Sequence, residues 1–433
     1  MKIRHLIPLF ISTLAFTSCA NANAAQAKKS AEWTVLVYMC GSNLESDLAN
    51  LTIYTDEYGN TYRWNGMGLA TMDIHEILSV KNKPSNVNIV LETGGSTKWT
   101  NKKHGKYGDY DISSTKLQRH HVTSKGKLKL DEELTYSCMG YSSTLQSFLE
   151  FGLKKYPAKK TALILWNHGG GLQGVCFDDK KNGDGLEGNE VIKAVSKALV
   201  NTNHEGEKLE FIGYDACLMA VQDNAELNSK YFNYMVCSEE TESGYGWDYD
   251  TWIDDLYALK DTPTILQAIC DGFIADNDVD EEGNDISQYN DQTLSYLDLR
   301  YADEYKTAWE NMAFHMSITR TNKSSFRSLV NSCKYYAGDS YSYYCLFDAK
   351  DFVTKLANDS TFNPGEAYTQ PVLTALAKLV GYTTCGAAAG NSNGLCMYWP
   401  TTRNATNYNT YDSTSTNFSN WSSLVSSYGG SGW

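Results

Sequence analysis

Five short apolar runs, separated by longer amphipathic segments, constrain the fold of this chain more than any other feature. The runs span residues 33–39, 87–93, 161–167, 209–215 and 234–240. Each is almost continuously apolar, which is typical of a strand that is covered on both faces of its sheet. Between them, residues 143–156 and 188–201 carry apolar side chains at the three- and four-residue spacing of a helix. The pattern predicts an α/β fold with a mostly parallel central sheet flanked by helices.

This alternation of strands and helices weakens beyond about residue 300, where Tyr, Ser and Asn become frequent. A chain of 433 residues, 42% of them hydrophobic, is long enough to bury a large core and to form more than one domain. We therefore expect an α/β domain over residues 31–300 and a smaller C-terminal region over residues 301–433.

The first 24 residues have the pattern of a signal peptide. A basic start precedes an apolar run at residues 6–16, which is too short to span a bilayer. Two processing outcomes are open, because the residues before Cys19 resemble a bacterial lipobox, whereas residues 22–24 form a small-x-small cleavage site. Both predict export, either as a secreted protein or at the outer cell surface through a lipid on Cys19. Residues 25–30 would then form a linker.

Charge and cysteine content exclude two classes of protein. The chain carries 37 basic and 51 acidic side chains, a formal net charge of -14, which has the wrong sign for a surface that binds nucleic acid. The 11 cysteines are odd in number and irregular in spacing, unlike a disulfide framework. Cys385 and Cys396, which flank a turn-rich segment, are the one candidate pair.

Residues that could carry chemistry follow three of the predicted strands. Ligands of a parallel sheet bind beyond the carboxyl ends of its strands, and these ends should gather at one edge. The third strand is followed by His168 and a triple-glycine loop, the fourth by Cys217, and the fifth by an acidic, glycine-containing segment. By position alone Cys217 would more often be a buried core thiol. A neighbouring His168 favours a nucleophile and its base instead, also helped by the helix expected to start after Cys217.

The same strand ends predict an oxyanion-binding site. Gly169 could offer its backbone N–H to the developing charge, together with the N–H of Cys217. Two other thiols compete for the role of nucleophile. We expect Cys176 to lie in a loop that is too mobile to hold a nucleophile in register. Cys237 ends the fifth apolar run and precedes acids that would raise its pKa, so Cys217 is the better candidate.

Four sequence blocks together resemble a known enzyme family. They read "WTVLVYMCGSNLESD", "YPAKKTALILWNHGGG", "LEFIGYDACLMA" and "CSEETESGYGWDYDTW". In this order and spacing they are similar to the blocks of the clostripain family of cysteine peptidases, which are relatives of caspases, gingipains and legumain. The resemblance spans residues 31–260, with weaker echoes towards the C-terminus. It implies a caspase-like peptidase domain over residues 31–300, with His168 as general base and Cys217 as nucleophile of an endopeptidase.

The resemblance also implies a substrate preference. Asp215 matches the acid that lines the first specificity pocket of the family and pairs with an Arg or Lys side chain before the scissile bond. A partly desolvated carboxylate suits that role, although an Asp here could instead cap the following helix. One departure weakens the preference, since relatives often carry an acid in a "PGDGW"-like turn where this chain has Tyr245. The pocket then has one charge fewer, which leaves open whether the preference is for Arg, for Lys or looser.

Members of this family are commonly made as zymogens and activated by self-cleavage between the His and Cys blocks. The matching interval here is hydrophilic and rich in glycine, and it contains Lys180 and Lys181. We expect an exposed loop that is cut after one of these lysines into two chains that stay associated. The alternative is an ordinary surface loop.

No cofactor is required by this chemistry, and the sequence contains no built metal site. Residues 178–185 do not supply the ligands of an EF-hand loop. The acidic residues 276–285 could bind Ca²⁺ loosely, as some relatives depend on calcium, but such charge runs are usually solvated surface. The prediction is an exported cysteine endopeptidase acting on peptides with Arg or Lys before the scissile bond. The alternatives are a non-catalytic binding lipoprotein on the same scaffold and a transpeptidase or ligase.

Overall fold

The computed structural model describes residues 30–49, 51, 53–55, 61–63, 66–101, 105–108, 110–280, 283–338, 341–400 and 418–429. The predicted signal peptide, Cys19 and most of the linker therefore lie outside the described residues. Within the described part of the chain, no helix is both long enough and apolar enough to cross a membrane.

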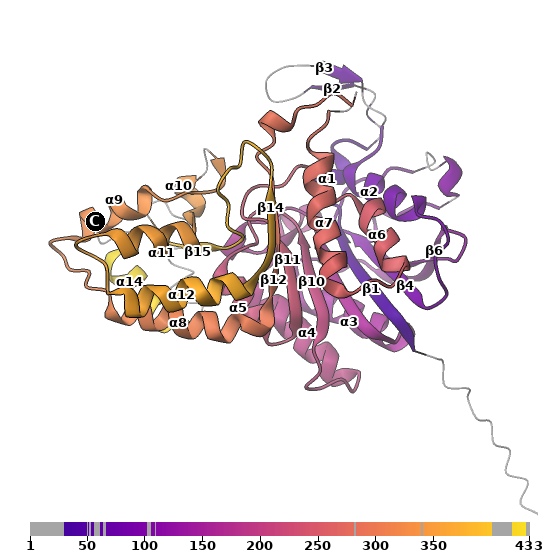
Figure 1. The fold of residues 1–433 in the computed structure, drawn as a ribbon. Coiled ribbons are helices and arrows are strands. Elements are labelled where there is room, and N and C mark those ends of the chain that lie inside the picture. The colour runs from indigo at the N-terminus through magenta and orange to yellow at the C-terminus, as the bar shows by residue number, and fades with distance from the viewer. Residues whose placement is uncertain are drawn as a thin grey trace, which may run out of the picture.

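A nine-stranded sheet forms the centre of the molecule, in the order β14-β12-β11-β10-β7-β1-β4-β5-β6 (Figure 1). Its strands are β1 Ala31–Cys40, β4 Val87–Gly94, β5 Lys116–Val122, β6 Leu128–Thr135, β7 Ala158–Trp166, β10 Leu209–Asp215, β11 Phe232–Cys237, β12 Thr293–Asp298 and β14 Val380–Cys385. The five predicted strands are all present, and they are the inner parallel strands β4, β1, β7, β10 and β11. Antiparallel strands, which the apolar pattern did not predict, extend both edges. The α/β prediction is thus confirmed, with parallel pairing confined to the middle of the sheet.

Both faces of the inner strands are buried, which explains their continuous apolar runs. In β1, Val35 and Val37 enter the core on one face, while Leu36 and Tyr38 enter the core on the other. All four side chains are at most 1% exposed. When both faces of a strand are buried, nearly every position is apolar, so the sequence does not alternate between apolar and polar residues.

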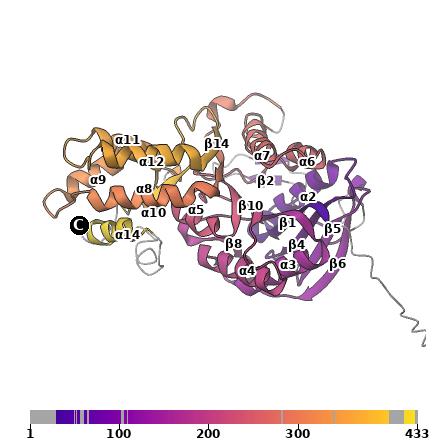
Figure 2. The same cartoon turned by 60° about the horizontal axis from the view of Figure 1, so that its bottom comes forward.

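Helices cover each face of this sheet. One layer consists of α2 Leu69–Ser79, α6 Tyr249–Tyr257 and α7 Thr262–Asp276. The opposite layer consists of α3 Ser142–Lys155, α4 Gly188–Asn201 and α5 Gln222–Ser229. Figure 2 shows α2, α6 and α7 on one side of the strands and α3 and α4 on the other. The predicted helices at 143–156 and 188–201 are α3 and α4.

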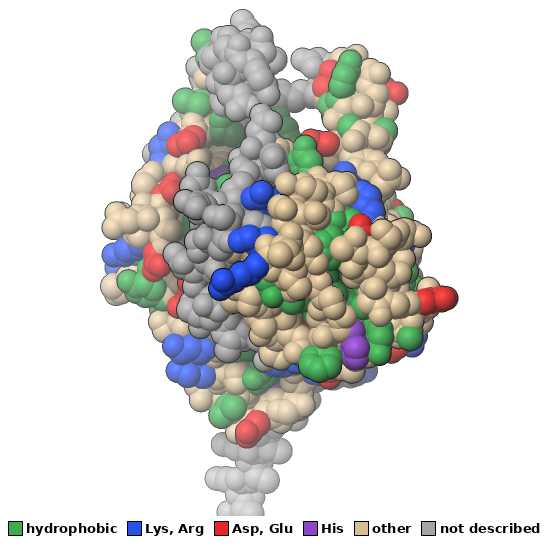
Figure 3. Space-filling model, turned by 90° about the vertical axis from the view of Figure 1, so that its left-hand side faces the viewer, with side chains coloured by type: hydrophobic (Ala, Val, Ile, Leu, Met, Phe, Trp, Pro, Cys, Tyr) green, Lys and Arg blue, Asp and Glu red, His purple; other side chains and the backbone are tan. Residues whose placement is uncertain are grey.

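The C-terminal region is built mainly of helices that extend beyond the β14 edge of the sheet (Figure 1). They are α8 Ala302–His315, α9 Lys323–Asn331, α10 Tyr341–Tyr344, α11 Ala349–Asn358, α12 Glu366–Leu379 and α14 Ser419–Tyr428. The rings of Trp309, Phe352 and Trp421 pack against one another in tilted and edge-to-face contacts in their shared core. Uncharged side chains dominate the far end of this region (Figure 3). Because β14 joins the main sheet beside β12, strands from both sides of residue 300 belong to one sheet.

Smaller elements complete the fold. They are α1 Ser42–Ser46, the hairpin of β2 Ile53–Thr55 and β3 Thr61–Arg63, the hairpin of β8 Val175–Asp178 and β9 Asp184–Leu186, and the pair β13 Leu346–Asp348 and β15 Cys396–Tyr398. Of these, α1 and the β8–β9 hairpin adjoin the carboxyl ends of the inner strands, where the candidate site lies.

Candidate active site

The register of two neighbouring strands brings His168 and Cys217 to the same level. Strands β7 and β10 are adjacent and parallel, and Trp166 at the end of β7 lies opposite Asp215 at the end of β10. The N–H of Asn167 continues this ladder by donating to the carbonyl oxygen of Asp215 at 3.2 Å. His168 and Cys217 each follow two residues beyond the opposed pair. The expectation that these strand ends gather at one edge is confirmed.

Gly169 lies directly against the backbone of Cys217. A Cβ atom added to Gly169 would lie 2.1 Å from the carbonyl oxygen of Cys217 and 3.0 Å from its backbone nitrogen. No side chain fits in that space, because the contact is with backbone that cannot rotate away. The glycine loop thus fixes the distance between the chain that carries His168 and the chain that carries Cys217.

Gly169→Ala is therefore expected to lower kcat/KM by about 10²-fold, comparable to the loss of one oxyanion donor. The extra methyl group must push the two strand ends apart, which misplaces the imidazole and both backbone N–H groups. Peptide hydrolysis and thermal unfolding, measured side by side, separate this effect from global destabilisation. Gly390→Ala is the matched control, since a Cβ there meets nothing closer than 4.0 Å. Unchanged activity in Gly169→Ala would show that the contact does not position the site.

His168, Cys217 and Asp215 line one pocket of about 200 Å³. Its lining is Leu44, Trp166, Asn167, His168, Asp215, Ala216, Cys217, Glu242, Ser243, Gly244 and Gly246. These residues follow the carboxyl ends of β1, β7, β10 and β11. The pocket therefore lies where the strand-end rule predicted, at the edge of the parallel part of the sheet.

The thiol of Cys217 is held by backbone N–H groups. The N–H of Glu242 donates to the sulfur at 3.2 Å. Burial, together with the nearby Glu242 carboxyl group, raises the pKa of the Cys217 thiol to about 11. The N–H groups of Glu242, Gly169 and Cys217 oppose this shift. In this state the sulfur is a thiol, so a base must remove its proton before it can attack.

The imidazole of His168 is anchored by a residue that the sequence patterns did not single out. Its Nε2 lies 2.7 Å from Oδ1 of Asn43, which is in α1 just beyond the carboxyl end of β1. If Nε2–H donates to this amide oxygen, Nδ1 is the ring nitrogen that is free to accept a proton. Burial lowers the pKa of His168, with Asp47 opposing, so the ring is neutral at pH 7 and can act as a base.

Asp215 is buried beside the thiol and is not a helix cap. Its Oδ2 accepts hydrogen bonds from the hydroxyl of Tyr249 at 2.9 Å and from the N–H of Trp247 at 3.5 Å. Burial raises the pKa of Asp215 to about 7. Helix α5 begins only at Gln222, and its first turn has no side-chain cap.

The expectation that a helix starting after Cys217 assists the thiol is wrong for the same reason. The chain instead turns sharply, with Leu218 in the left-handed region at a φ of 65°. The N–H of Leu218 donates to the carbonyl oxygen of Glu240 at 3.0 Å. Any lowering of the thiol pKa therefore comes from individual N–H groups rather than from a helix dipole.

Tyr245 does not face the pocket. The nearby wall consists of Ser243, Gly244 and Gly246, whereas Tyr245 lines a separate hollow of about 400 Å³ with Asp276 and other residues. Two acids that the sequence patterns missed lie at the pocket instead. Glu242 is one of its lining residues, and Asp73 of α2 lies behind Gly246.

Comparison with known proteins decides the family. The model of the clostripain peptidase family matches residues 53–428 of this chain. The chain belongs to the clostripain family. It is accordingly a cysteine peptidase, a hydrolase of peptide bonds, which favours the enzyme over the non-catalytic alternative.

The clostripain-family assignment agrees with individual relatives. Clostripain of Hathewaya histolytica is 26% identical over 410 residues, which cover 81% of this chain and 74% of that protein. A secreted C11 cysteine protease from Bacteroides thetaiotaomicron, solved with an irreversible peptide inhibitor, has a TM-score of 0.63 at 11% identity and covers 90% of this chain and 99% of its own. An inactive zymogen C11 protease from Parabacteroides distasonis has a TM-score of 0.58 at 19% identity and covers 86% and 92%. These two structures show the shared caspase-like fold.

The candidate self-cleavage segment of this clostripain-family chain is an ordered hairpin and not a loose loop. Lys180 is held in the turn that joins β8 to β9. Its N–H donates to Oδ1 of Asp178, its ammonium group donates to the carbonyl oxygen of Ser114, and the ammonium nitrogen lies 4.4 Å from the centre of the Tyr136 ring. Lys181 is exposed next to the turn. Only the tip of the hairpin is therefore accessible without unfolding.

The competing thiols are excluded by burial. Cys176 is fully buried in β8, so the expectation that it lies in a mobile loop is wrong, although it remains a poor nucleophile. Cys237 is also fully buried, and burial more than the neighbouring acids raises its pKa. All ten cysteines among the described residues are free thiols, Cys385 and Cys396 included. Of these ten, Cys217 and Cys385 alone are not fully buried.

No group of three or more His, Cys, Asp or Glu side chains that could hold a metal occurs in the described part of this clostripain-family chain. Glu281 and Glu282, within the acidic candidate segment 276–285, are outside that part. Calcium binding there stays a prediction.

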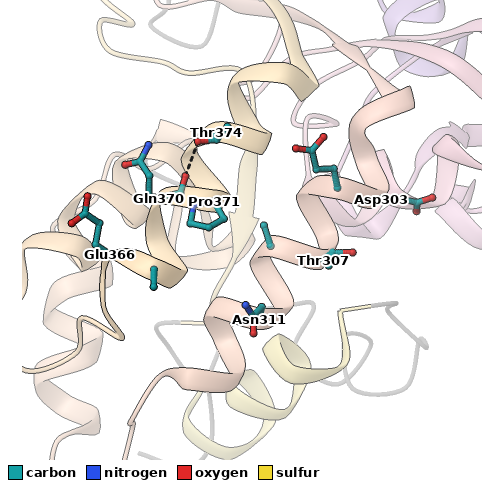
Figure 4. Close-up of a pocket in the computed structure, with 10 residues that line it drawn as sticks. Asp303, Thr307, Asn311, Glu366, Gln370, Pro371 and Thr374 are labelled. Atoms are coloured by element: carbon teal, nitrogen blue, oxygen red, sulfur yellow. Dashed lines mark hydrogen bonds between the residues drawn. The ribbon is translucent and has the colours of Figure 1, made fainter.

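A larger groove of this clostripain-family chain lies elsewhere among the described residues. It has a volume of about 1150 Å³ and runs between α8 and α12 of the C-terminal region (Figure 4). Acidic and amide side chains such as Asp303, Glu366 and Gln370 line it, without any Cys, His or Ser. Glu304 at its edge is paired with Lys378. The groove thus has neither a thiol nor an imidazole, and the smaller pocket at Cys217 is the candidate active site.

Proposed function

We propose that this peptidase cleaves peptide bonds after basic residues, with Cys217 as nucleophile and His168 as general base. The observation that carries the proposal is the single pocket shared by Cys217, His168 and Asp215. A thiol, a neutral imidazole and a buried carboxylate within one small cavity match the three needs of such an enzyme: a nucleophile, a base and a partner for the cationic side chain.

In the proposed reaction, Cys217 gives its proton to the free ring nitrogen of His168 while its sulfur bonds to the scissile carbonyl carbon. The N–H groups of Gly169 and Cys217 stabilise the resulting oxyanion. The tetrahedral intermediate collapses when His168 passes the proton to the leaving amine, which leaves an acyl-enzyme. A water molecule, deprotonated by His168, then attacks the thioester, and the released sulfur recovers the proton.

The basic preference rests on Asp215. Its carboxylate is 4% exposed and lies two residues before the nucleophile, on the wall of the same pocket. A guanidinium or ammonium group entering the pocket would ionise this carboxyl group and pair with it, whereas a neutral side chain would leave a buried charge or a protonated acid.

We also propose that the protein is exported, through residues 1–24, and that Cys19 carries a lipid anchor if the lipobox is used. Support comes from the sequence pattern of this segment and from the solved relatives, some of which are described as secreted. Metabolic labelling with a radioactive fatty acid, compared between wild type and Cys19→Ala, distinguishes the two processing outcomes.

The proposed activity is tested with four peptides that differ only in the residue before the scissile bond, which is Arg, Lys, Asn or Asp. Hydrolysis of the Arg and Lys peptides alone, lost in Cys217→Ala, is the expected result. Cleavage after Asn or Asp would contradict the basic preference. Peptide joining in the presence of a second amine, without hydrolysis, would indicate a ligase instead.

Self-cleavage in the β8–β9 hairpin is proposed to activate the enzyme. We expect the cut after Lys181, because Lys180 is held by three contacts while Lys181 is exposed. The two chains should stay together, since Val175, Cys176 and Leu186 of the hairpin are buried in the core. Wild-type protein should convert to two bands on a denaturing gel and one species in gel filtration.

Lys180→Ala/Lys181→Ala should remain a single chain, whereas Lys197→Ala, at an exposed lysine of α4, should be cut like the wild type. Cys217→Ala should also remain a single chain. If purified Cys217→Ala is still cut at the hairpin, another protease performs the cleavage.

A further inference from the structure

A second buried carboxylate adjoins the pocket, behind Gly246. A Cβ atom on Gly246 would lie 2.8 Å from Oδ2 of Asp73 and 3.2 Å from Oδ1 of Asp215. The two carboxylates therefore approach the same small space from different elements, Asp73 from α2 and Asp215 from the end of β10. Gly246, with a φ of 71°, keeps that space free of side-chain atoms.

One carboxylate oxygen of Asp73 is hydrogen-bonded to a residue of the pocket, and the other has no hydrogen-bond partner. Its Oδ2 accepts a hydrogen bond of 2.5 Å from the indole N–H of Trp166, a residue that lines the pocket. Its Oδ1 is buried and has no hydrogen-bond partner, and Asp73 is 0% exposed. A buried carboxylate oxygen without a partner is costly, and a ligand that donates hydrogen bonds to it would remove that cost.

No basic side chain of the described residues compensates these acids. None of the ion pairs in the described part of the chain includes Asp73, Asp215 or Glu242. Burial raises the pKa of all three carboxyl groups, so a cationic ligand is the partner that would ionise them and pair with them.

We propose that Asp73 and Asp215 together bind one guanidinium group, so that Asp73 selects arginine over lysine before the scissile bond. The inference rests on the proposed function and names a residue that determines its substrate. A guanidinium carries five N–H donors in a planar fork and can bond two carboxylates at once. A lysine ammonium group is a compact point charge with three donors. A second carboxylate therefore strengthens the binding of lysine less than that of arginine.

The position of Asp73 also explains how the pocket can have a second acid although Tyr245 occupies the turn where relatives often carry one. A second acid is absent from the turn in which relatives often carry one, and the side chain there faces a different hollow. Asp73 of α2 supplies a second acid instead, with its Oδ2 2.8 Å from the position of a Cβ atom on Gly246. The pocket consequently keeps two carboxylates in addition to Glu242.

The test compares kcat/KM of wild type, Asp73→Asn and Asp254→Asn on three peptides that carry Arg, Lys or citrulline before the scissile bond. Asn retains an oxygen for the Trp166 hydrogen bond but removes the charge. Asp73→Asn should lower the ratio of Arg to Lys at least about 10-fold, with the citrulline peptide little changed. Asp254→Asn, which removes a carboxylate at an exposed position of α6 outside the pocket, should keep the wild-type ratio. An unchanged ratio in Asp73→Asn would overturn the inference.

Two measurements separate this inference from the proposed function and from misfolding. Agmatine, which carries a guanidinium but no scissile bond, should bind the wild type at least about 10-fold more tightly than Asp73→Asn in calorimetry, and equal affinities would overturn the inference even if no peptide is cleaved. If Asp73→Asn does not fold, a crystal structure of Cys217→Ala with an arginine peptide decides. A guanidinium nitrogen within about 3.5 Å of Oδ1 of Asp73 is expected, and one that contacts Asp215 alone would overturn the inference.

Discussion

Cys217→Ala is expected to remain folded and to lose peptidase activity by a factor of at least about 10⁴. The sulfur is the atom that bonds to the substrate in the proposed reaction, and no other thiol lines the pocket. The variant removes one partly buried atom, whose contacts are N–H groups that water can satisfy. Single-turnover and steady-state hydrolysis of an Arg peptide measure the loss, and circular dichroism checks the fold.

Cys385→Ala is the matched control for this variant. Cys385 is the other described thiol that is not fully buried, and it lies at the end of β14 outside the pocket. It should retain wild-type activity and should not be the site of inactivating alkylation by iodoacetamide. If Cys217→Ala keeps substantial activity while a different cysteine variant loses it, the assignment of the nucleophile is wrong.

Asp215→Asn is expected to lower kcat/KM for an Arg peptide by about 10² to 10³-fold, because a buried cation then loses its charged partner. The amide keeps the size of the side chain and can still accept the hydrogen bond from Tyr249. A citrulline peptide, which has no charge to lose, should be cleaved by wild type and variant at similar rates. Asp254→Asn, at an exposed position of α6, removes the same charge away from the pocket and should have no effect.

The pH dependence gives this prediction a second readout. Burial raises the pKa of Asp215 to about 7, so the carboxyl group is neutral below that pH and charged above it. Wild-type kcat/KM for the Arg peptide, divided by that for the citrulline peptide, should rise through pH 7, and in Asp215→Asn it should stay flat. A steep rise in the variant would mean that a different acid controls the preference.

The stability of the folded protein should fall as pH rises, whereas the Arg-to-citrulline ratio of kcat/KM rises. Since the folded-state pKa of Asp215 is above its unfolded value, the folded state holds a proton that the unfolded state has lost between about pH 4 and pH 7. Stability falls as pH rises through that window. Asp215→Asn removes this penalty, so its melting temperature relative to the wild type should be higher at pH 8 than at pH 4.

The continuous apolar runs in the sequence predicted the inner strands of the sheet, but they gave no indication of the edge strands. β1, β7 and β10 are dry on both faces and read as unbroken apolar runs. β6 is largely exposed, with charged residues such as Asp131 and Glu132, and β14 is partly exposed along most of its length. A strand at the edge of a sheet with one wet face needs few apolar residues, so its sequence resembles a loop.

The residues of the candidate site likewise fall into those that the sequence indicated and those that only the structure revealed. Strand-end patterns indicated His168, Gly169 and Cys217, which directly follow recognisable strands, and the family resemblance added Asp215. Neither singled out Asn43, Glu242 or Asp73. A signal for Asn43 was present, since it also follows an inner strand, but an asparagine after a Gly-Ser pair is equally typical of a turn. Asp73 had no such signal, because it lies inside a helix, and the helix sequence does not show that this position adjoins the pocket.

What the sequence by itself determined is the central α/β layer and the order of reactive groups along its edge. Local apolar patterning specifies strands and helices, and parallel strands place their carboxyl ends together whatever else the chain does. The tertiary structure decided the state of each group. The buried thiol of Cys217, the neutral ring of His168 and the second carboxylate of Asp73 depend on contacts between residues far apart in the chain. Burial and close approach set pKa values and pocket charge, and neither can be read from neighbours in sequence.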